Sequence, residues 1–129
     1  MKKKIAILGS TGSIGKTTFN IIKKNRKEFE LVLLTTNKNI KEISKQAREL
    51  QVKNILINSK THYLKFKKNS KNKKVNIYND FQTFGKKFKN KFDYTMSAIS
   101  GLAGLKPTLD LIIFSKKIAI ANKESIICG

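Results

Sequence analysis

A glycine-rich turn after a short apolar segment constrains the fold of this chain more than any other feature. Residues 4–8 end in four apolar side chains, a pattern typical of a strand buried on both faces of a parallel sheet. Gly9, Gly12 and Gly15 follow at once, and residues 13–25 carry apolar side chains at close to helical spacing. In such a unit one glycine permits the turn, one lets the backbone approach a pyrophosphate, and one lets helix and strand pack closely. Because the helix start offers N–H groups to phosphates, the turn predicts a dinucleotide site.

A P-loop and a turn without a ligand are the two other interpretations of this segment. Gly15, Lys16 and Thr17 match the end of a P-loop in letters, but Gly12 lies only three residues before Gly15. A P-loop has four residues between its glycines, so the spacing excludes it. A purely structural strand-to-helix turn without a ligand remains the alternative.

The segment after the second predicted strand indicates which dinucleotide is bound. NAD sites place an Asp or Glu there to hold the ribose hydroxyls, but residues 35–39 contain no acid. The positive charge of Lys38 would attract a 2′-phosphate, and Thr36, Asn37 and Asn39 can donate hydrogen bonds. We therefore expect NADPH rather than NADH. A plainer interpretation, in which Asn39 only caps the next helix and Lys38 is only solvated, can hold at the same time.

Predicted strands and helices alternate along the chain. The strands are expected at residues 4–8, 31–35, 54–58, 75–78, 93–98 and 117–121. The helices are expected at residues 13–25, 39–50 and 61–68, after Asp80 with Phe81, Phe84 and Phe88 on one face, and from Pro107 to about residue 115. This alternation predicts one α/β domain over residues 1–129, Rossmann-like, with an open, mostly parallel sheet and helices on both faces.

The charge balance raises nucleic acid as a rival partner. The chain has 26 Lys, 2 Arg and 8 acidic residues, a net charge of +20, and aromatic side chains lie among the lysines of residues 60–91. A basic nucleic-acid-binding protein is therefore an alternative. Phosphate-binding surfaces usually contain Arg, however, and Lys, Asn and Ile, all with A+T-rich codons, make 55 of the 129 residues. We interpret most of the charge as compositional drift and do not expect nucleic acid as a partner.

The chain shows no sign of a membrane segment or a disulfide framework. Its apolar runs are far too short to cross a membrane, and no signal-peptide core follows the N-terminal lysines. The single cysteine, Cys128, excludes an internal disulfide and fits a reducing compartment. We expect a cytoplasmic protein.

Residues suited to catalysis are scarce. The chain contains no pair of carboxylates spaced for acid–base work and no cluster suited to a metal ion. His62, the only histidine, is expected on the surface, and Cys128 has no obvious basic partner. Residues 97–101 and 122–125 are the exceptions, because each segment follows a predicted strand, where ligands of open α/β sheets lie. A polar loop without a ligand is the alternative interpretation of residues 122–125.

Four segments together resemble a known family. Residues 7–15 (ILGSTGSIG), 37–39 (NKN), 98–105 (AISGLAGL) and 120–125 (IANKES) are similar in order and spacing to the N-terminal NADPH-binding domain of the 1-deoxy-D-xylulose-5-phosphate reductoisomerase family. The resemblance runs from residue 4 to residue 129 and is weakest over residues 55–92. It implies an enzyme of the non-mevalonate isoprenoid pathway that isomerises 1-deoxy-D-xylulose 5-phosphate and reduces it with NADPH to 2-C-methyl-D-erythritol 4-phosphate. It also implies a divalent cation, Mg²⁺ or Mn²⁺, in the full-length enzyme.

The resemblance also implies roles for individual residues. The cofactor phosphates would contact Thr11, Gly12, Ser13 and Ile14. The adenosine 2′-phosphate would lie among Asn37, Lys38 and Asn39. The nicotinamide side would be held by Asn122 and Glu124, and the phosphorylated sugar substrate by Lys123. Asn37 stands where the family commonly has Gly. Because Asn tolerates a positive φ better than most residues, we expect the loop to keep its form with altered contacts.

The family's metal-binding and substrate-phosphate residues lie C-terminal to the segment matched by residues 120–125. The resemblance therefore implies a cofactor domain with no catalytic or metal-binding residue of its own, and we expect residues 1–129 alone not to turn over substrate. A fragment and the product of a disrupted gene are both open explanations. The full-length enzyme would be a homodimer. A Rossmann domain of another NADP-dependent dehydrogenase is the remaining alternative.

Overall fold

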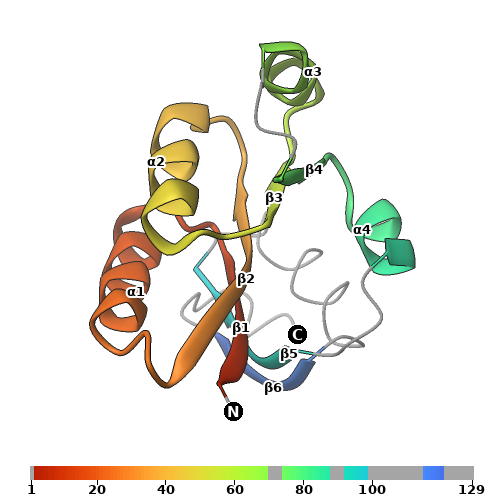
Figure 1. The fold of residues 1–129 in the computed structure, drawn as a ribbon. Coiled ribbons are helices and arrows are strands. Elements are labelled where there is room, and N and C mark those ends of the chain that lie inside the picture. The colour runs from red at the N-terminus through yellow and green to blue at the C-terminus, as the bar shows by residue number, and fades with distance from the viewer. Residues whose placement is uncertain (1, 70–73, 88–91, 99–114, 121–129) are drawn as a thin grey trace.

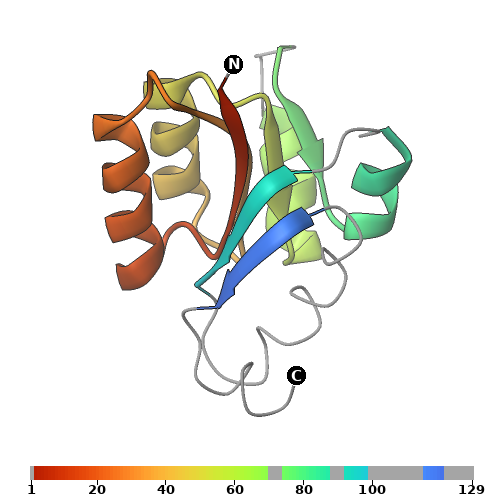
Figure 2. The ribbon, with the colours of Figure 1, turned by 90° about the horizontal axis from the view of Figure 1, so that it is seen from below.

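Six parallel strands form one sheet in the computed structural model, which describes residues 2–69, 74–87, 92–98 and 115–120 (Figure 1). The strands are β1 (Lys3–Leu8), β2 (Phe29–Thr36), β3 (Asn54–Ile57), β4 (Asn76–Tyr78), β5 (Phe92–Ser97) and β6 (Ser115–Ile120). Their order is β4-β3-β2-β1-β5-β6, and every neighbouring pair is parallel. Figure 2 shows β5 and β6 continuing the sheet beyond β1. The strand order reverses at β1, which is where open α/β sheets bind ligands.

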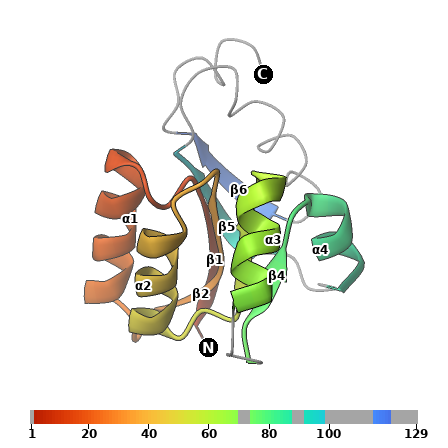
Figure 3. The same ribbon diagram turned by 90° about the horizontal axis from the view of Figure 1, so that it is seen from above.

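Helices cover both faces of this sheet. They are α1 (Ser13–Lys24), α2 (Ile40–Leu50), α3 (Lys60–Asn69) and α4 (Phe81–Lys87). Figure 3 shows α1 and α2 side by side, with α4 on the other side of the strands. In α3, Tyr63 and Phe66 pack against the apolar cluster that α1 and α2 cover. The predicted Rossmann-like architecture is confirmed, and none of the helices in the described ranges has the length and apolar character needed to cross a membrane.

Two strands begin two residues earlier than the sequence predicted, and the other predicted bounds within the described ranges agree to within one residue. β2 begins at Phe29 rather than Leu31, because Lys3 and Lys4 of β1 extend the pairing to Phe29 and Glu30. β6 begins at Ser115, which pairs with Phe92, although Ser115 was expected to end a helix. The rest of the helix expected from Pro107, like Phe88 of the preceding one, lies outside the described residues.

Alternate residues of β1 supply the two cores. Ile5 and Ile7 belong to the cluster beneath α1 and α2, whereas Ala6 and Leu8 belong to the cluster beneath α4. All four are at most 6% exposed, because successive side chains of a strand point to opposite faces. A strand between two helical layers must therefore be apolar at every position, as the predicted pattern required.

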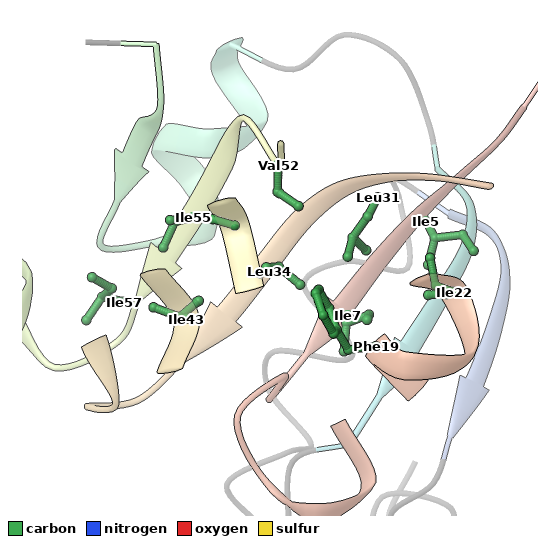
Figure 4. Packing of buried hydrophobic residues seen from close by; sticks show 11 residues of the cluster. Ile5, Ile7, Phe19, Ile22, Leu31, Leu34, Ile43, Val52, Ile55 and Ile57 are labelled. Atoms are coloured by element: carbon green, nitrogen blue, oxygen red, sulfur yellow. The ribbon is translucent and has the colours of Figure 1, made fainter. Parts of the chain in front are cut away.

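The first cluster joins α1 and α2 to the middle of the sheet. Figure 4 shows its side chains converging from the two helices and from β1, β2 and β3. Its buried members are Ile5, Ile7, Phe19, Ile22, Leu31, Leu34, Ile43, Ala47, Val52, Ile55 and Ile57. On the surface, the Lys23 ammonium donates to Glu49 Oε2 at 2.8 Å and lowers the pKa of that carboxyl.

The second cluster is built on aromatic rings. Phe84 of α4 lies edge-on to Tyr78, with ring centroids 5.2 Å apart, and stacks on Phe92 at 6.0 Å. Burial raises the pKa of the Tyr78 hydroxyl. Asp80 caps the start of α4, because its Oδ1 accepts a hydrogen bond from the Thr83 N–H at 2.7 Å. Phe81 and Phe84 are buried as predicted, so these rings serve the core and are not available to stack on bases.

Candidate cofactor site

The glycine-rich turn is fastened to the end of β2. The Gly9 N–H donates to Thr35 Oγ1 at 3.0 Å, and the Ser10 N–H donates to the Thr35 carbonyl at 2.9 Å. Gly9 has a φ of 74°, a conformation that side chains other than glycine's rarely adopt. These contacts hold the turn between the carboxyl ends of β1 and β2, the edge at which the sequence predicted the ligand.

The other two glycines differ in the space around them. A Cβ at Gly15 would lie 2.1 Å from the Gly9 carbonyl oxygen and 2.7 Å from the Ser10 backbone, so α1 approaches the turn as closely as backbone permits. A Cβ at Gly12 would meet nothing closer than the Gly9 oxygen at 3.9 Å. Gly9 thus permits the turn and Gly15 permits the close contact between α1 and the turn. Gly12 has free space where a side chain would lie.

The start of α1 has no side-chain cap. Gly12 stands at the cap position, and the backbone bond that opens the helix runs from the Lys16 N–H to the Gly12 carbonyl at 2.8 Å. The N–H groups of Ser13, Ile14 and Gly15 precede that bond and have no intrahelical acceptor. Uncapped N–H groups and the helix dipole together favour a bound anion.

The loop after β2 lies directly beside this turn. Thr36 Oγ1 is 2.8 Å from Thr11 Oγ1 and accepts the Asn39 N–H at 3.3 Å. Asn39 Oδ1 in turn accepts the Glu42 N–H at 3.2 Å, which confirms the predicted cap of α2. Residues 11–14 and 37–39, at least 23 positions apart in sequence, therefore meet at one edge.

The structure changes two expectations, one about Asn37 in this loop and one about His62 in α3. Asn37 does not use a positive φ, since Gln51 is the only non-glycine residue with one in the described ranges. The loop keeps its form because the Asn37 carbonyl accepts the Ser59 N–H at 3.0 Å, and the tolerance of Asn for the left-handed region is not needed. His62 is half-buried rather than a plain surface residue, with Nδ1 2.7 Å from Ser59 Oγ.

Gln46 is a site residue that the sequence analysis missed. Its Nε2 donates to the Ser10 carbonyl at 2.8 Å, and the residue is only 2% exposed. Its Oε1 has no hydrogen-bond partner among the described residues. A glutamine on the buried face of α2, next to Ala47 and three residues after Ile43, was the signal available.

We expect Gln46→Leu to lower the free energy of unfolding by about 2 kcal/mol, because the buried Ser10 carbonyl would lose its donor. Equilibrium unfolding in urea measures the change. Gln46→Glu is the matched control: it keeps the shape but exchanges the donor for an acceptor, and should be at least as damaging. Equal stability of Gln46→Leu and the wild type would contradict the role.

The remaining predicted site residues lie outside the described ranges. These are Asn122, Lys123 and Glu124. Cys128, for which no site role was expected, also lies outside the described ranges. The described residues nearest to these site residues are at the same edge as the turn, because Leu8 pairs with Ser97 and Ser97 pairs with Ile120. No group of three or more His, Cys, Asp or Glu in the described ranges is placed to hold a metal ion.

Known proteins match this chain over nearly its whole length. The family profile of 1-deoxy-D-xylulose 5-phosphate reductoisomerase matches residues 5–129. The chain belongs to this family. The reductoisomerase of Pelagibacter ubique is 54% identical over 98% of this chain and 33% of its own length. That of a Thermoanaerobacter species is 39% identical over 97% of this chain and 32% of its own. The chain thus spans about a third of the length of the curated relatives it matches.

Solved reductoisomerase structures are similar over the same extent. A complex of the Zymomonas mobilis enzyme with NADPH has a TM-score of 0.87 and 32% identity to this chain. The match covers 100% of this chain and 34% of the Zymomonas mobilis chain. A reductoisomerase complex with NADPH, fosmidomycin and magnesium has a TM-score of 0.83 and 29% identity, covering 97% of this chain and 31% of its own. The chain therefore has the fold of the part of these structures that it matches, about a third of each.

Proposed function

We propose that this chain is the NADPH-binding part of a 1-deoxy-D-xylulose 5-phosphate reductoisomerase. The observation that carries the proposal is that the uncapped start of α1 lies beside the loop after β2, which contains no acidic residue. The hydrogen bond between the Thr11 and Thr36 hydroxyls joins the two segments. The first suits a pyrophosphate, and the second suits a 2′-phosphate. The NADPH in the similar Zymomonas mobilis structure supports the same cofactor here.

Different residues would bind different parts of NADPH. Residues 11–14 would bind the pyrophosphate through backbone N–H groups, and residues 37–39 would surround the 2′-phosphate. Asn122 and Glu124 would contact the nicotinamide side, and Lys123 would reach the substrate. These assignments rest on position in the family motifs, and for the first two groups also on the contacts described above.

The full-length protein would isomerise 1-deoxy-D-xylulose 5-phosphate and reduce the product with NADPH to 2-C-methyl-D-erythritol 4-phosphate. A divalent cation, Mg²⁺ or Mn²⁺, would polarise the substrate's oxygens. We assign no metal ligand and no catalytic residue to the described part of the chain, which has no suitable cluster. We further propose that the full-length enzyme is a homodimer, as the family resemblance implies, and that it is cytoplasmic, because the single cysteine fits a reducing compartment.

Nucleic-acid binding is not favoured. Of the aromatic side chains among the lysines of residues 60–91, Tyr78, Phe81 and Phe84 are at most 9% exposed and pack in the second cluster. They cannot stack on bases while the fold is intact. The family match also disfavours another NADP-dependent dehydrogenase.

Exchange of one charge tests the proposed cofactor. We expect Lys38→Glu to raise the Kd for NADPH about tenfold, because a charge-assisted contact to the 2′-phosphate becomes a repulsion. The Kd for NADH should change much less, since NADH lacks that phosphate. Titration calorimetry with both nucleotides measures the two constants.

Lys45→Glu on the outer part of α2 is the matched control. It makes the same charge change on an exposed residue of the helix that follows Lys38. Because Lys45 is seven positions after Lys38, or about 10 Å along a helix at about 1.5 Å per residue, the variant should leave both constants within about twofold, since exposed charges farther apart than a Debye length of about 8 Å are screened. Equal effects of Lys38→Glu on NADPH and NADH would refute the assignment of Lys38.

A further inference from the structure

A basic hollow of about 500 Å³ lies between the start of α2 and one side of α3. One wall is the loop and first turn of α2, contributing Lys38, Asn39, Ile40 and Lys41. The other wall is α3, contributing His62, Lys65, Phe66 and Asn69. The α3 residues are spaced as one face of a helix, at intervals of three, one and three. Three of the eight lining residues are lysines and none is acidic.

The hollow is an extension of the candidate site, because it shares residues with it. Lys38 and Asn39, which the proposed function places around the 2′-phosphate, form part of its lining. The start of α3 is held against this loop by two backbone bonds. The Asn58 N–H donates to the Thr36 carbonyl and the Ser59 N–H to the Asn37 carbonyl, both at 3.0 Å. α3 therefore keeps a defined position relative to the loop.

The imidazole of His62 is oriented from one side. Ser59 Oγ accepts the His62 backbone N–H at 3.4 Å and lies 2.7 Å from the ring Nδ1. In the tautomer that accepts the Ser59 hydroxyl hydrogen at Nδ1, the ring carries its proton on Nε2. Nε2 is then a hydrogen-bond donor, and it belongs to a residue that lines the hollow.

The floor and the rim of the hollow differ in character. Ile40 and Phe66 are half-buried and pack against the first cluster, so they give the hollow an apolar part. Lys38, Lys41 and Lys65 are exposed and supply positive charge. An apolar floor with a cationic rim suits a planar base that carries a phosphate group nearby.

We propose that α3 forms the second wall of the adenosine 2′-phosphate subsite, with Lys65 and His62 as specificity-determining residues that face the same phosphate as Lys38. The proposal rests on the proposed function and extends it to a helix in the segment where the family resemblance is weakest. The discrimination between NADPH and NADH then comes from two helices and not from the loop after β2 alone.

The test compares two charge reversals on α3. Lys65→Glu changes a residue that lines the hollow, and Lys68→Glu makes the same change at an exposed residue of the same helix that does not line it. The ligands are NADPH, NADH and adenosine 2′,5′-bisphosphate, titrated by calorimetry into the folded chain. The thermal midpoint of each variant shows that the fold is intact.

We expect Lys65→Glu to raise the Kd for NADPH and for adenosine 2′,5′-bisphosphate about fivefold while that for NADH stays within about twofold. Lys68→Glu should leave all three constants near those of the wild type. His62→Ala should show a smaller change of the same pattern, and His62→Gln, which keeps a donor, should restore part of it.

The outcomes separate this inference from the proposed function. If the wild type binds NADPH saturably and Lys38→Glu weakens it, but Lys65→Glu and Lys68→Glu behave alike, the proposed function stands and the role of α3 is overturned. Equal losses for NADPH and NADH in Lys65→Glu would also overturn it. A wild type that does not bind NADPH would overturn both.

Discussion

Gly15→Ala is expected to lower the free energy of unfolding by about 3 kcal/mol or more, the upper range for overpacking a tightly filled site. The added methyl group would lie 2.1 Å from the Gly9 carbonyl oxygen and 2.7 Å from Ser10 Cα and C. All three atoms are backbone, so no side chain can rotate away. Relief would require α1 to move from β1, which would loosen Phe19 and Ile22 in the first cluster. Equilibrium unfolding in urea, followed by circular dichroism, measures the loss.

Gly12→Ala is the matched control for this prediction. Its methyl group would have only the Gly9 oxygen within reach, at 3.9 Å, and the backbone at Gly12 has φ −79° and ψ 177°, which alanine adopts freely. We expect its stability to lie within about 0.5 kcal/mol of the wild type. If Gly15→Ala were equally harmless, α1 would not depend on the close approach that the structure shows.

The fold was predictable where burial determines the residue types. Ile5 and Ile7 lie beneath α1 and α2 and Ala6 and Leu8 lie beneath α4, so an uninterrupted apolar run was a direct sign of a two-sided strand. Gly9 and Gly15 were equally readable, because a turn with Gly9 at positive φ and a contact as close as that of Gly15 exclude other residues.

What could not be predicted depends on contacts between distant segments. The early start of β2 follows from the length of β1, and nothing in the polar residues near Phe29 signals it. Gln46 reaches the Ser10 carbonyl across 36 positions of sequence. The position of His62 beside the α2 start depends on the backbone bond from Ser59 to Asn37, which no local pattern encodes. Predictions from spacing therefore indicated the two loops that meet at the candidate site, but not the side chains that support them.

Gly12→Asp is expected to raise the Kd for NADPH at least about a hundredfold while the chain stays folded. Gly12 holds the cap position of α1, where Asp is among the preferred residues. The new carboxylate would accept the N–H groups at the helix start that the pyrophosphate needs, and it would repel the phosphates as well. Loss of two charge-assisted bonds of about 1.5–3 kcal/mol each accounts for the factor.

The signs of the two effects of Gly12→Asp make the prediction specific. The cap should keep or slightly raise the thermal midpoint of the chain, since Asp at a cap position is better than Gly by only about a few tenths of a kcal/mol, while the same group weakens NADPH binding. Gly12→Asn separates the effect of the negative charge from that of the capping hydrogen bond. It caps α1 without a negative charge and should weaken NADPH binding less than Gly12→Asp does. Calorimetric titration with NADPH and a thermal melt on each variant measure both effects. Wild-type affinity in Gly12→Asp would mean that the uncapped start of α1 is not where the cofactor phosphates bind.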